Sequence, residues 1–366
     1  MTDRDLDSPV RLVATLSCVP LDNGVAFVRG GRLVQAKGDP ALIGDIADRL
    51  RAGTTRAALS GCLPLDTIDA LLARLDAEGW LTAEPAGSGA VGMPWERQHG
   101  YLTMFGPEAD RMQQRLRDAT VGILGVGGIG ALVAQHLVAA GVGELWLVDF
   151  DAVASHNLNR QYVFGTEDIG RSKVDAAMAG LGRLSPHTRF HPVQQAVRDP
   201  ADLEALPDGL DLLVVAADTP PDIAAICWRW AAPRNVAMTA AAVGLTTGFW
   251  GPLLVPERGD CHDCFHHARQ QAISPLERQL EKALGDPTPY SFGPSNSAIA
   301  AMLGFDVCRY LAAGAAGTLG RRGILNFEDG RMSYYEPDPG QRCAAHAGAG
   351  EPPAPVVAGT GGSNDH

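Results

Sequence analysis

The sequence has none of the features of a membrane-spanning or secreted protein. No stretch of its 366 residues approaches the roughly 18 uninterrupted apolar residues of a transmembrane helix. Residues 1–7 are mostly polar and acidic, without the apolar core of a signal peptide. The seven cysteines are few and odd in number, which disfavours a disulfide framework. We therefore expect a protein of the reducing cytoplasm that has no membrane partner.

Basic residues are in the minority. Lys and Arg together number 30 against 42 Asp and Glu, so the formal net charge is −12 at pH 7. Binding along a nucleic-acid backbone needs a basic surface, so we expect no nucleic-acid partner. Hydrophobic residues make up 46% and charged residues 20% of the chain, proportions typical of a globular protein with a substantial core.

Residues 1–90 form the first of three regions. The apolar runs 25–28 and 32–34 are joined by Gly30 and Gly31, which predicts a β-hairpin because glycine tolerates the positive φ that a two-residue turn requires. Apolar residues then recur at helical spacing twice, at Leu42, Ile43, Ile46 and Leu50 and at Ile68, Leu71, Leu72 and Leu75. We predict a small winged-helix-like domain, followed by a Gly-, Ala- and Pro-rich linker over 84–94.

Residues 95–346 form the second region. Its strand candidates are Val121–Leu124, Glu144–Val148, Leu210–Ala217 and Val236–Ala242. They are continuously apolar rather than alternating, and helical segments lie between several of them. This pattern predicts a Rossmann-like, doubly wound α/β fold with a parallel sheet covered on both faces. The third region, 347–366, is Gly-, Ala- and Pro-rich, and we expect it to be a disordered tail.

A glycine-rich turn follows the first strand of the second region. Gly125, Gly127, Gly128 and Gly130 match the dinucleotide fingerprint, in which missing side chains let the backbone approach phosphates at a helix N-terminus. Asp149 ends the next strand, where a carboxylate can accept hydrogen bonds from ribose hydroxyls. Taken alone, this pattern is also compatible with an NAD-dependent oxidoreductase.

Two cations beyond Asp149 change that interpretation. Hydride transfer has no need of Arg160 and Lys173, whereas breaking the α–β phosphate bond of ATP requires cations that stabilise the departing pyrophosphate. We expect both side chains to be solvent-accessible in the empty site. Asp218 follows a buried apolar run, at the carboxyl end of a strand where open α/β sheets bind ligands, and it suits Mg²⁺. The sequence therefore favours ATP and Mg²⁺ over NAD.

The same segments carry a family resemblance. Residues 95–346 resemble the E1-like adenylating enzymes of the ThiF/MoeB group. The matching pieces are Gly125–Gly130, Leu147–Asp151, Asn157–Gln161, Gly170–Lys173 and Val214–Asp218. The resemblance implies an adenylyltransferase in which Asp149 holds the ribose and Asp151 belongs to the nucleotide site. It further implies that the ATP phosphates contact Asn157, Arg160, Gln161 and Lys173, and that Asp218 holds Mg²⁺.

Arg97 and Gln98 extend the resemblance to a second subunit. They resemble the N-terminal Arg-Gln pair of the family, whose arginine reaches the partner subunit's nucleotide. The resemblance therefore implies a homodimer in which Arg97 joins the catalytic residues of the other subunit.

Two pairs of soft ligands predict a metal site. Cys261 and Cys264 form one pair at x₂ spacing, and Cys343 and His346 form the other. Four such ligands suit a closed tetrahedral structural zinc site. The E1-like family commonly has CxxC in both places, and here a histidine replaces the last cysteine. The alternatives for the fourth ligand are His262, His266 and His267, and unligated cysteines remain a further alternative.

A thioester relay of the ubiquitin-activating kind is disfavoured. No cysteine lies between Cys264 and Cys308, and Cys308 belongs to an apolar segment that predicts a buried helix. We therefore expect the product to be an acyl-adenylate.

Residues 1–90 also resemble a known module. Their order of elements is similar to the PqqD-like leader-peptide recognition domains, which bind a peptide as an added strand at a sheet edge. A structural or dimerisation cap is the alternative. A leader-binding module joined to an E1-like core resembles the microcin-C-maturing enzymes, which implies adenylation of a carboxylate of a ribosomal precursor peptide in antibiotic biosynthesis. Two further hypotheses are activation of a sulfur-carrier protein and non-catalytic delivery of leader peptides to a cyclodehydratase.

Overall fold

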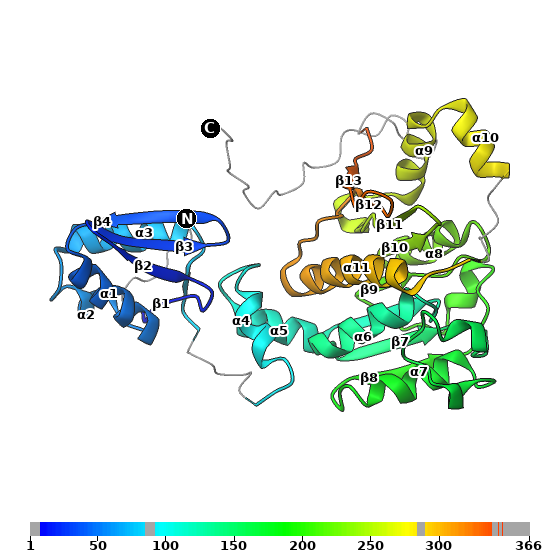
Figure 1. The fold of residues 1–366 in the computed structure, drawn as a ribbon, viewed down its shortest axis with the longest axis horizontal. Helices are drawn as coiled ribbons and strands as arrows, with labels where there is room; N and C mark the ends of the chain where they lie inside the picture. Colours follow the sequence, from blue (N-terminus) through cyan, green and yellow to red (C-terminus); the bar gives the residue numbers. More distant parts are fainter. Residues whose placement is uncertain (1–7, 85–91, 284–289, 339–342, 344–345, 347–366) are drawn as a thin grey trace. The chain divides into compact units, whose positions relative to one another are not determined.

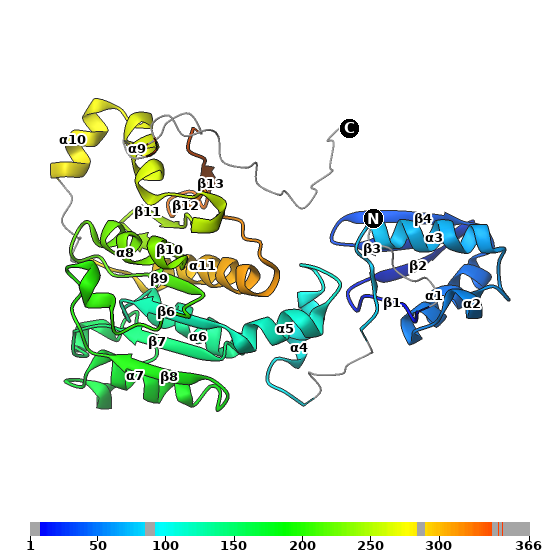
Figure 2. The same ribbon diagram turned by 180° about the vertical axis from the view of Figure 1, so that it is seen from behind.

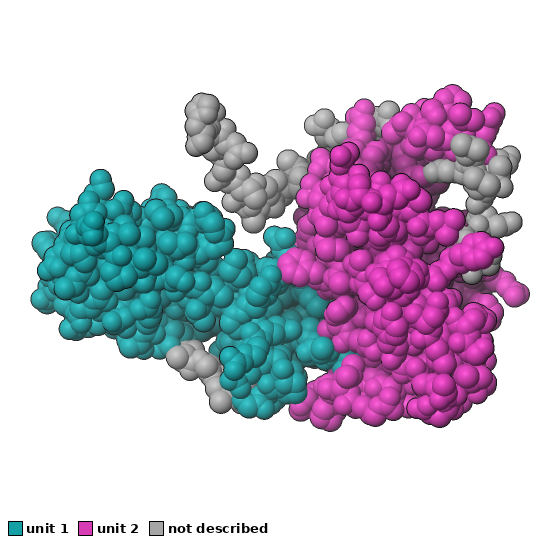
Figure 3. Space-filling model, in the orientation of Figure 1, with its two compact units in different colours: residues 1–119, 138–143, 308–314 teal, residues 120–137, 144–307, 315–366 magenta. Residues whose placement is uncertain are grey.

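The computed structural model describes residues 8–84, 92–283, 290–338, 343 and 346 (Figure 1). The chain divides into two compact units (Figure 3). The first comprises residues 1–119, 138–143 and 308–314, and the second comprises 120–137, 144–307 and 315–366. The boundary expected at residues 90–95 falls inside the first unit, and the expected tail lies outside the described residues, so these domain limits remain predictions. Within the described part of the chain, no helix is long and apolar enough to cross a membrane.

The N-terminal part of the first unit contains the predicted hairpin and helices. A three-stranded antiparallel sheet has the order β2 (Ser17–Leu21), β3 (Gly24–Arg29), β4 (Arg32–Lys37), and a second pair joins β1 (Arg11–Leu12) to β5 (Leu81–Thr82). The helices are α1 (Pro40–Ala52), α2 (Arg56–Leu59) and α3 (Leu65–Ala77). Gly30 and Gly31 have φ angles of 57° and 81°, the positive values that a two-residue turn of type I′ requires. The hairpin prediction is therefore confirmed.

One face of this small sheet packs on the helices. Val25 and Phe27 point from β3 into a core that also contains Ile46 and Leu50 of α1 and Leu72 of α3. The hairpin is tied to the end of α3 by charged groups as well. Arg29 donates to the carbonyl of Gly79 at 3.0 Å, and Glu78 forms ion pairs with Arg32 and Arg74. These contacts hold the hairpin against the end of α3. A hairpin packed on small helices is the arrangement that the sequence predicts for a winged-helix-like domain.

Two further helices, α4 (Glu96–Leu102) and α5 (Ala109–Asp118), complete the first unit. On α5, Met112 and Leu116 are buried, as expected for a helix with one apolar face. Gln98 of α4 donates to Oε1 of Gln113 and to the carbonyl of Ala140. The two helices are therefore joined by part-buried polar contacts as well as by apolar packing.

The second unit is built on an eight-stranded sheet (Figures 1 and 2). Its strands, in order across the sheet, are β13 (Met332–Tyr335), β12 (Arg322–Asn326), β11 (Thr247–Trp250), β10 (Ala237–Val243), β9 (Leu212–Val215), β6 (Thr120–Leu124), β7 (Glu144–Val148) and β8 (Arg189–Val193). The five strands from β10 to β8 are parallel, which confirms the prediction for this part. The other three are antiparallel, an extension that the sequence analysis missed. β10 and β11 are joined by a connection too short for a parallel crossover.

Helices pack on this sheet, with α7 against β8 and α8 against β9 and β10. The helices in this part of the chain are α6 (Gly130–Ala140), α7 (Lys173–Gly182), α8 (Ile223–Ala231), α9 (His262–Ala272), α10 (Pro275–Ala283) and α11 (Gly293–Ala313). α8 buries Ile226 and Trp230 against the strands, in a cluster with Leu213 and Met238. The chain crosses from β6 to β7 in one direction and from β9 to β10 in the other, so right-handed crossovers put α6 and α8 on opposite faces. The sheet is therefore doubly wound, as predicted.

The strand order creates a switch point between β6 and β9. The chain leaves β6 toward β7 and later returns to β9 on the other side of β6. The loops after these two neighbouring strands therefore diverge, and open α/β sheets bind ligands in that crevice. Gly125 follows β6 and Asp218 follows β9 shortly after its last residue, so the fold puts both predicted segments at the switch point.

Candidate nucleotide and metal sites

The glycines of the turn have different roles. Gly125 has a φ of 88°, and a Cβ there would lie 2.6 Å from the backbone nitrogen of Ala217, beside the end of β9. A Cβ on Gly130 would overlap the carbonyl oxygen of Gly125. These two positions need glycine because backbone segments approach each other closely. They shape the turn and do not need a ligand to explain them.

Gly127 is the glycine that leaves room for a ligand. A Cβ added there would meet, among the described residues, only Nε2 of Gln161, at 3.7 Å. A Cβ on Gly128 would instead overlap Oδ1 of Asn296 and lie 3.3 Å from Cγ of Arg160. The space beside Gly127 can therefore receive a phosphate, whereas the space beside Gly128 is filled by protein.

Asp149 braces the turn. Its side chain is 7% exposed, Oδ2 accepts from the backbone nitrogen of Val126 at 2.7 Å, and Oδ1 accepts from that of Asp151 at 2.9 Å. Burial raises the pKa of this carboxyl above its ordinary value, opposed by the charge of Lys173 and by the two backbone hydrogen bonds. A carboxylate has about four acceptor positions, so capacity remains for ribose hydroxyls.

Lys173 is the first residue of α7, and its charge is paired. Nζ lies 2.7 Å from Oδ2 of Asp151, and the backbone nitrogen of Lys173 donates to the carbonyl of Asp151 at 2.9 Å. The lysine is only 7% exposed. The expectation that Lys173 is solvent-accessible is therefore wrong, because α7 packs into the unit at its first turn and the ion pair draws the side chain inward.

Arg160 is half-buried and points back into its own turn. Its Nη1 donates to the carbonyl of His156 at 2.8 Å and to Oδ1 of Asn159 at 2.9 Å. Asn157 is buried in the same turn, and its Oδ1 accepts from the backbone nitrogen of Ala154. Asn157 therefore fixes the shape of the turn that carries Arg160.

Two buried polar atoms in this region have no hydrogen-bond partner among the described residues. They are Oε1 of Gln161, whose side chain is 2% exposed, and Oγ of Ser172, next to Lys173. Buried polar atoms without partners are rare in folded proteins and call for a missing partner. Oε1 only accepts, so it calls for a donor such as a hydroxyl group, whereas the hydroxyl of Ser172 can donate to a phosphate oxygen. Together with the open side of Gly127, these residues fit a polar ligand that carries both hydroxyl groups and phosphates.

The structure brings most of the predicted nucleotide-site residues into one place in the second unit. Asp218 is exposed just beyond β9, and its Oδ1 accepts from the hydroxyl of Thr219 at 3.3 Å. Arg97 is exposed on α4, which belongs to the first unit, outside this group. The sequence analysis missed Asn296, because a single asparagine at the start of a helix far along the chain carries no recognisable signal.

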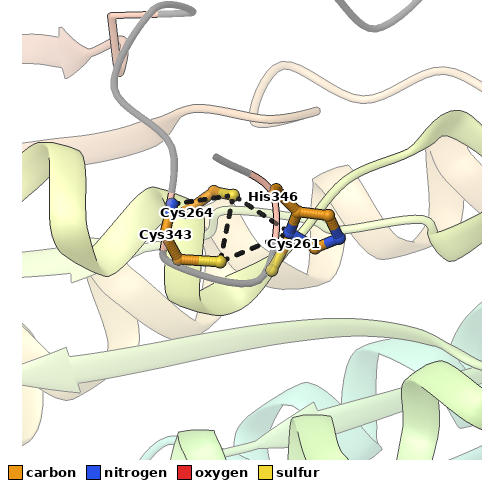
Figure 4. A group of neighbouring side chains, drawn as sticks. All are labelled: Cys261, Cys264, Cys343 and His346. Atoms are coloured by element: carbon orange, nitrogen blue, oxygen red, sulfur yellow. Dashed lines mark hydrogen bonds between the residues drawn. The ribbon is translucent and has the colours of Figure 1, made fainter. Parts of the chain in front are cut away.

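The second predicted site is a cluster of three cysteines and one histidine (Figure 4). The ligand atoms of Cys261, Cys264, Cys343 and His346 all lie within 4.8 Å of one another. Sγ of Cys264 lies 3.6 Å from Sγ of Cys343 and 3.4 Å from Nδ1 of His346, and the last two atoms are 3.3 Å apart. Cys261 precedes α9 and Cys264 lies in its first turn, so the cluster joins α9 to the C-terminal segment.

These separations suit a tetrahedral metal. Zinc–sulfur bonds of about 2.3 Å in a tetrahedron separate the ligand atoms by about 3.8 Å. His346 belongs to the cluster, whereas the ring of His262 lies 3.2 Å from Oδ1 of Asp263 and stacks on His266. Among the alternatives for the fourth ligand, the geometry therefore favours His346. The donor set fits zinc.

Cys308 and Cys227, which lie outside the cluster, are poor candidates for a nucleophile. Burial raises the pKa of the Cys308 thiol on α11 to about 12, and that of Cys227 on α8 to about 12. Thiols with such values are protonated near neutral pH, and the thiolate is the nucleophilic form. This agrees with the expectation that no thioester relay passes through Cys308.

The chain is similar to known adenylyltransferases in sequence. The ThiF family model matches residues 96–341. A molybdopterin-synthase adenylyltransferase of Escherichia coli (strain K12) is 42% identical over 106 residues, which cover 29% of this chain and 42% of that protein. A sulfur carrier protein adenylyltransferase of Thermus thermophilus is 35% identical over 169 residues, covering 44% of this chain and 60% of that protein. The matches thus span less than two thirds of these relatives.

Solved structures share the fold over nearly the whole chain. The crystal structure of E. coli MccB with ATP has a TM-score of 0.74 at 22% identity, covering 90% of this chain and 96% of that chain. The structure of the microcin C7 biosynthetic enzyme MccB in complex with N-formylated MccA has a TM-score of 0.74 at 21% identity, covering 96% and 100%. At these identities the likeness establishes the fold alone. Because the family match extends over more than half of the sequence, the chain belongs to the ThiF family.

Proposed function

We propose that this protein is an ATP-dependent adenylyltransferase that activates a carboxylate of a ribosomal precursor peptide as an acyl-adenylate. The observation that carries the proposal is the arrangement around Gly127, whose open side is bordered by Nε2 of Gln161, an amide donor that can face a phosphate oxygen. Lys173 and Arg160 flank the same switch point. Relatives named adenylyltransferases support this reading.

The proposed reaction is a displacement at the α-phosphorus of ATP. A substrate carboxylate oxygen forms a new bond to phosphorus, the bond from that phosphorus to the bridging oxygen breaks, and pyrophosphate leaves with the electron pair. No general base is needed, because the carboxylate is already ionised. Negative charge that develops on the leaving group is stabilised by Lys173 and Arg160, with Arg97 supplied by the second subunit of a homodimer.

The other residues of the site position the nucleotide. Asp149 accepts from the ribose hydroxyls with the lone pairs that Val126 and Asp151 leave free. The backbone at Gly127 and the N-terminus of α6 receive phosphate oxygens. Asp218 would hold Mg²⁺, which neutralises phosphate charge when bound. The chain's own contribution to the rate is therefore mainly positioning and electrostatics.

We assign the cysteine–histidine cluster a structural role. Cys261, Cys264, Cys343 and His346 would hold one zinc ion in a closed site, without a free position for a substrate. Two observations support this role. The ligand atoms are close enough to share one ion, and the two ligand pairs lie far apart along the chain, so the site would join α9 to the C-terminal segment.

For the N-terminal sheet we propose leader-peptide binding at the free edge of β4. In a two-residue hairpin, Arg29 and Arg32 form a hydrogen-bonded pair, so the N–H group of Gln35 points away from β3. The same alternation directs the backbone nitrogen of Pro20 to the free edge of β2, where proline has no hydrogen to donate. β4 can thus pair with an added strand, whereas β2 lacks a donor on its free edge at Pro20, one residue before the strand ends.

Activation of a sulfur-carrier protein is the second candidate function. It is favoured by the names of the sequence relatives, which include a sulfur carrier protein adenylyltransferase. Its first chemical step would be identical. The N-terminal sheet favours the peptide substrate over the carrier protein. Non-catalytic delivery to a cyclodehydratase and NAD-dependent chemistry are both disfavoured, because Arg160 and Lys173 have no use in them.

ATP–pyrophosphate exchange tests the proposal. The full chain would be assayed with synthetic candidate precursor peptides and, separately, with a sulfur-carrier protein ending in Gly-Gly. Exchange that requires the peptide would support the proposal. Exchange only with the carrier would select the second function, and exchange with neither, in folded protein that does not bind ATP, would favour the delivery role.

A further inference from the structure

Asn296 lies in the first turn of α11 and is buried against the glycine-rich turn. Its side chain is 5% exposed. Nδ2 donates to Oγ of Ser291 at 2.9 Å and to the carbonyl of Phe292 at 2.8 Å. Because both amide hydrogens have acceptors, the orientation of the amide is settled, and Oδ1 faces Gly128.

Position 128 needs a glycine because a larger residue would collide with Asn296. Its φ lies outside the positive range, so an alanine there would adopt the same backbone without strain. The obstacle is space, since a Cβ would overlap Oδ1 of Asn296, lie 3.0 Å from its Cγ and lie 3.3 Å from Cγ of Arg160. Gly127 differs, because its free side is open. The two adjacent glycines therefore serve different purposes.

A second route links Asn296 to Arg160. The segment that Asn296 holds includes Ser291, whose carbonyl accepts from Nδ2 of Asn159 at 3.2 Å. Oδ1 of Asn159 in turn accepts from Nη1 of Arg160. Asn296 and the stem of Arg160 therefore both border the position above Gly128, and Asn296 supports the guanidinium through a short chain of hydrogen bonds.

Resting on the nucleotide site proposed above, we propose that Asn296 is a positioning residue. It holds the glycine-rich turn and the stem of Arg160 in the geometry that accepts the triphosphate. It need not touch ATP to do so. Its effect is expected on nucleotide affinity, through Gly128 and Arg160, rather than on folding alone.

A double-mutant cycle tests this, with the dissociation constant for ATP measured by titration calorimetry on the full chain. We expect Gly128→Ala to weaken ATP binding about tenfold or more and Asn296→Ala to weaken it about threefold to tenfold. The double variant should bind ATP at least about threefold more tightly than Gly128→Ala alone, because the smaller side chain makes room for the methyl group. Ser295→Ala is the matched control, since its hydroxyl donates to the carbonyl of Phe292 from the same turn.

The outcomes separate the two proposals. If the wild-type chain binds ATP and the double variant binds no better than Gly128→Ala, the positioning role is wrong. If the wild-type chain binds no ATP, the nucleotide site and this inference fall together. Thermal unfolding of each variant identifies any that misfold. Should Gly128→Ala misfold, Asn296→Asp replaces it, because a carboxylate against Gly128 should repel the triphosphate, and wild-type affinity there would overturn the proposal.

Discussion

Nζ of Lys173 lies 2.7 Å from Oδ2 of Asp151, and the lysine is buried while the aspartate is 45% exposed. The pair fixes the ammonium group before any nucleotide arrives. A buried cation acts on nearby charge more strongly than one in water, because less solvent screens it. The exposed carboxylate also remains hydrated, so the pair does not carry the full desolvation penalty of a buried one. The arrangement suits a cation that must stabilise charge on a departing group.

Removing either cation should reduce adenylation. We expect Lys173→Ala and Arg160→Ala each to lower kcat/KM by about tenfold to a thousandfold, a loss of about 1.4–4 kcal/mol of transition-state stabilisation. The two should differ in stability. Lys173→Ala also removes a buried stem, so it should lower the unfolding free energy by about 1–2 kcal/mol, whereas the half-buried Arg160 should matter less. Pyrophosphate exchange and thermal unfolding measure the two effects.

Lys173→Met, which keeps most of the stem, should restore stability but not activity. Unchanged kinetics in both alanine variants would contradict the mechanism.

A matched pair of substitutions tests the different roles assigned to Gly127 and Gly130. Gly127→Ala should fold normally, because its Cβ meets only Gln161 at 3.7 Å, but it should weaken ATP binding by about tenfold or more. Gly130→Ala should instead lower the melting temperature, because its Cβ overlaps the backbone of Gly125. Calorimetric titration and thermal unfolding distinguish the two outcomes. Normal ATP affinity in Gly127→Ala would place the phosphates elsewhere.

Much of this could be predicted from local pattern. The Gly30-Gly31 hairpin follows from the φ values that the turn demands, and β7 spans the residues that the sequence analysis assigned to it. The metal cluster follows from two short ligand spacings. In each case the signal lies within a few residues.

The rest depends on contacts between distant segments. Lys173 is buried together with an ion-pair partner, Asp151, that lies 22 residues away, and no local sequence pattern predicts this burial. The antiparallel strands β11 to β13 are short and of mixed composition, so their direction is set by the length of their connections rather than by composition. Asn296 meets Gly128 from a different region of the chain. Such pairings arise only when the sheet and α11 assemble.

The zinc prediction concerns stability rather than chemistry. Purified protein should contain about one zinc ion per chain. Cys261→Ser and Cys343→Ser should each lose the metal and lower the melting temperature, because the site joins α9 to the C-terminal segment. Elemental analysis gives the metal content, and Cys62→Ser, at a partly buried cysteine outside the cluster, serves as the control. Absence of zinc from protein prepared without chelators would refute the site, whereas retention of zinc in His346→Ala would refute only its fourth ligand.

Asp149 should make nucleoside binding depend on pH. Its pKa is raised in the folded protein, so the proton is held more tightly than in the unfolded chain. The charged carboxylate therefore opposes folding at pH values above the folded pKa, and this unfavourable contribution is relieved as the pH falls through it. Ribose binding behaves oppositely, because the protonated carboxyl accepts less well. Adenosine affinity should fall on acidification at a pH above the ordinary aspartate pKa of about 3.9.

Adenosine is the appropriate probe because it carries no phosphate that titrates in this range. The dissociation constant would be measured by calorimetry across about pH 4–7, above the ordinary aspartate pKa. Asp218→Asn should keep the pH dependence, since Asp218 is placed near phosphates rather than ribose. Asp149→Asn should weaken binding at every pH and remove the dependence. A flat profile in the wild-type protein would show that Asp149 does not hold the ribose.

The N-terminal sheet decides between a peptide substrate and a carrier protein. Gln35→Pro removes a backbone donor from the free edge of β4 without taking one from its pairing with β3. If β4 pairs with a leader peptide, this change should raise KM for the full-length precursor by about tenfold or more, with kcat on a leaderless fragment unchanged, because the contact is remote from the reacting carboxylate. Pro20→Ala on the opposite edge is the control and should leave KM unchanged or lower it.

Removal of residues 1–90 should raise KM for the full-length precursor further. Fluorescence polarisation with labelled leader would show whether a fragment of those residues binds it alone. If KM is unaffected by both changes, the sheet is a structural cap and activation of a sulfur-carrier protein becomes the better hypothesis.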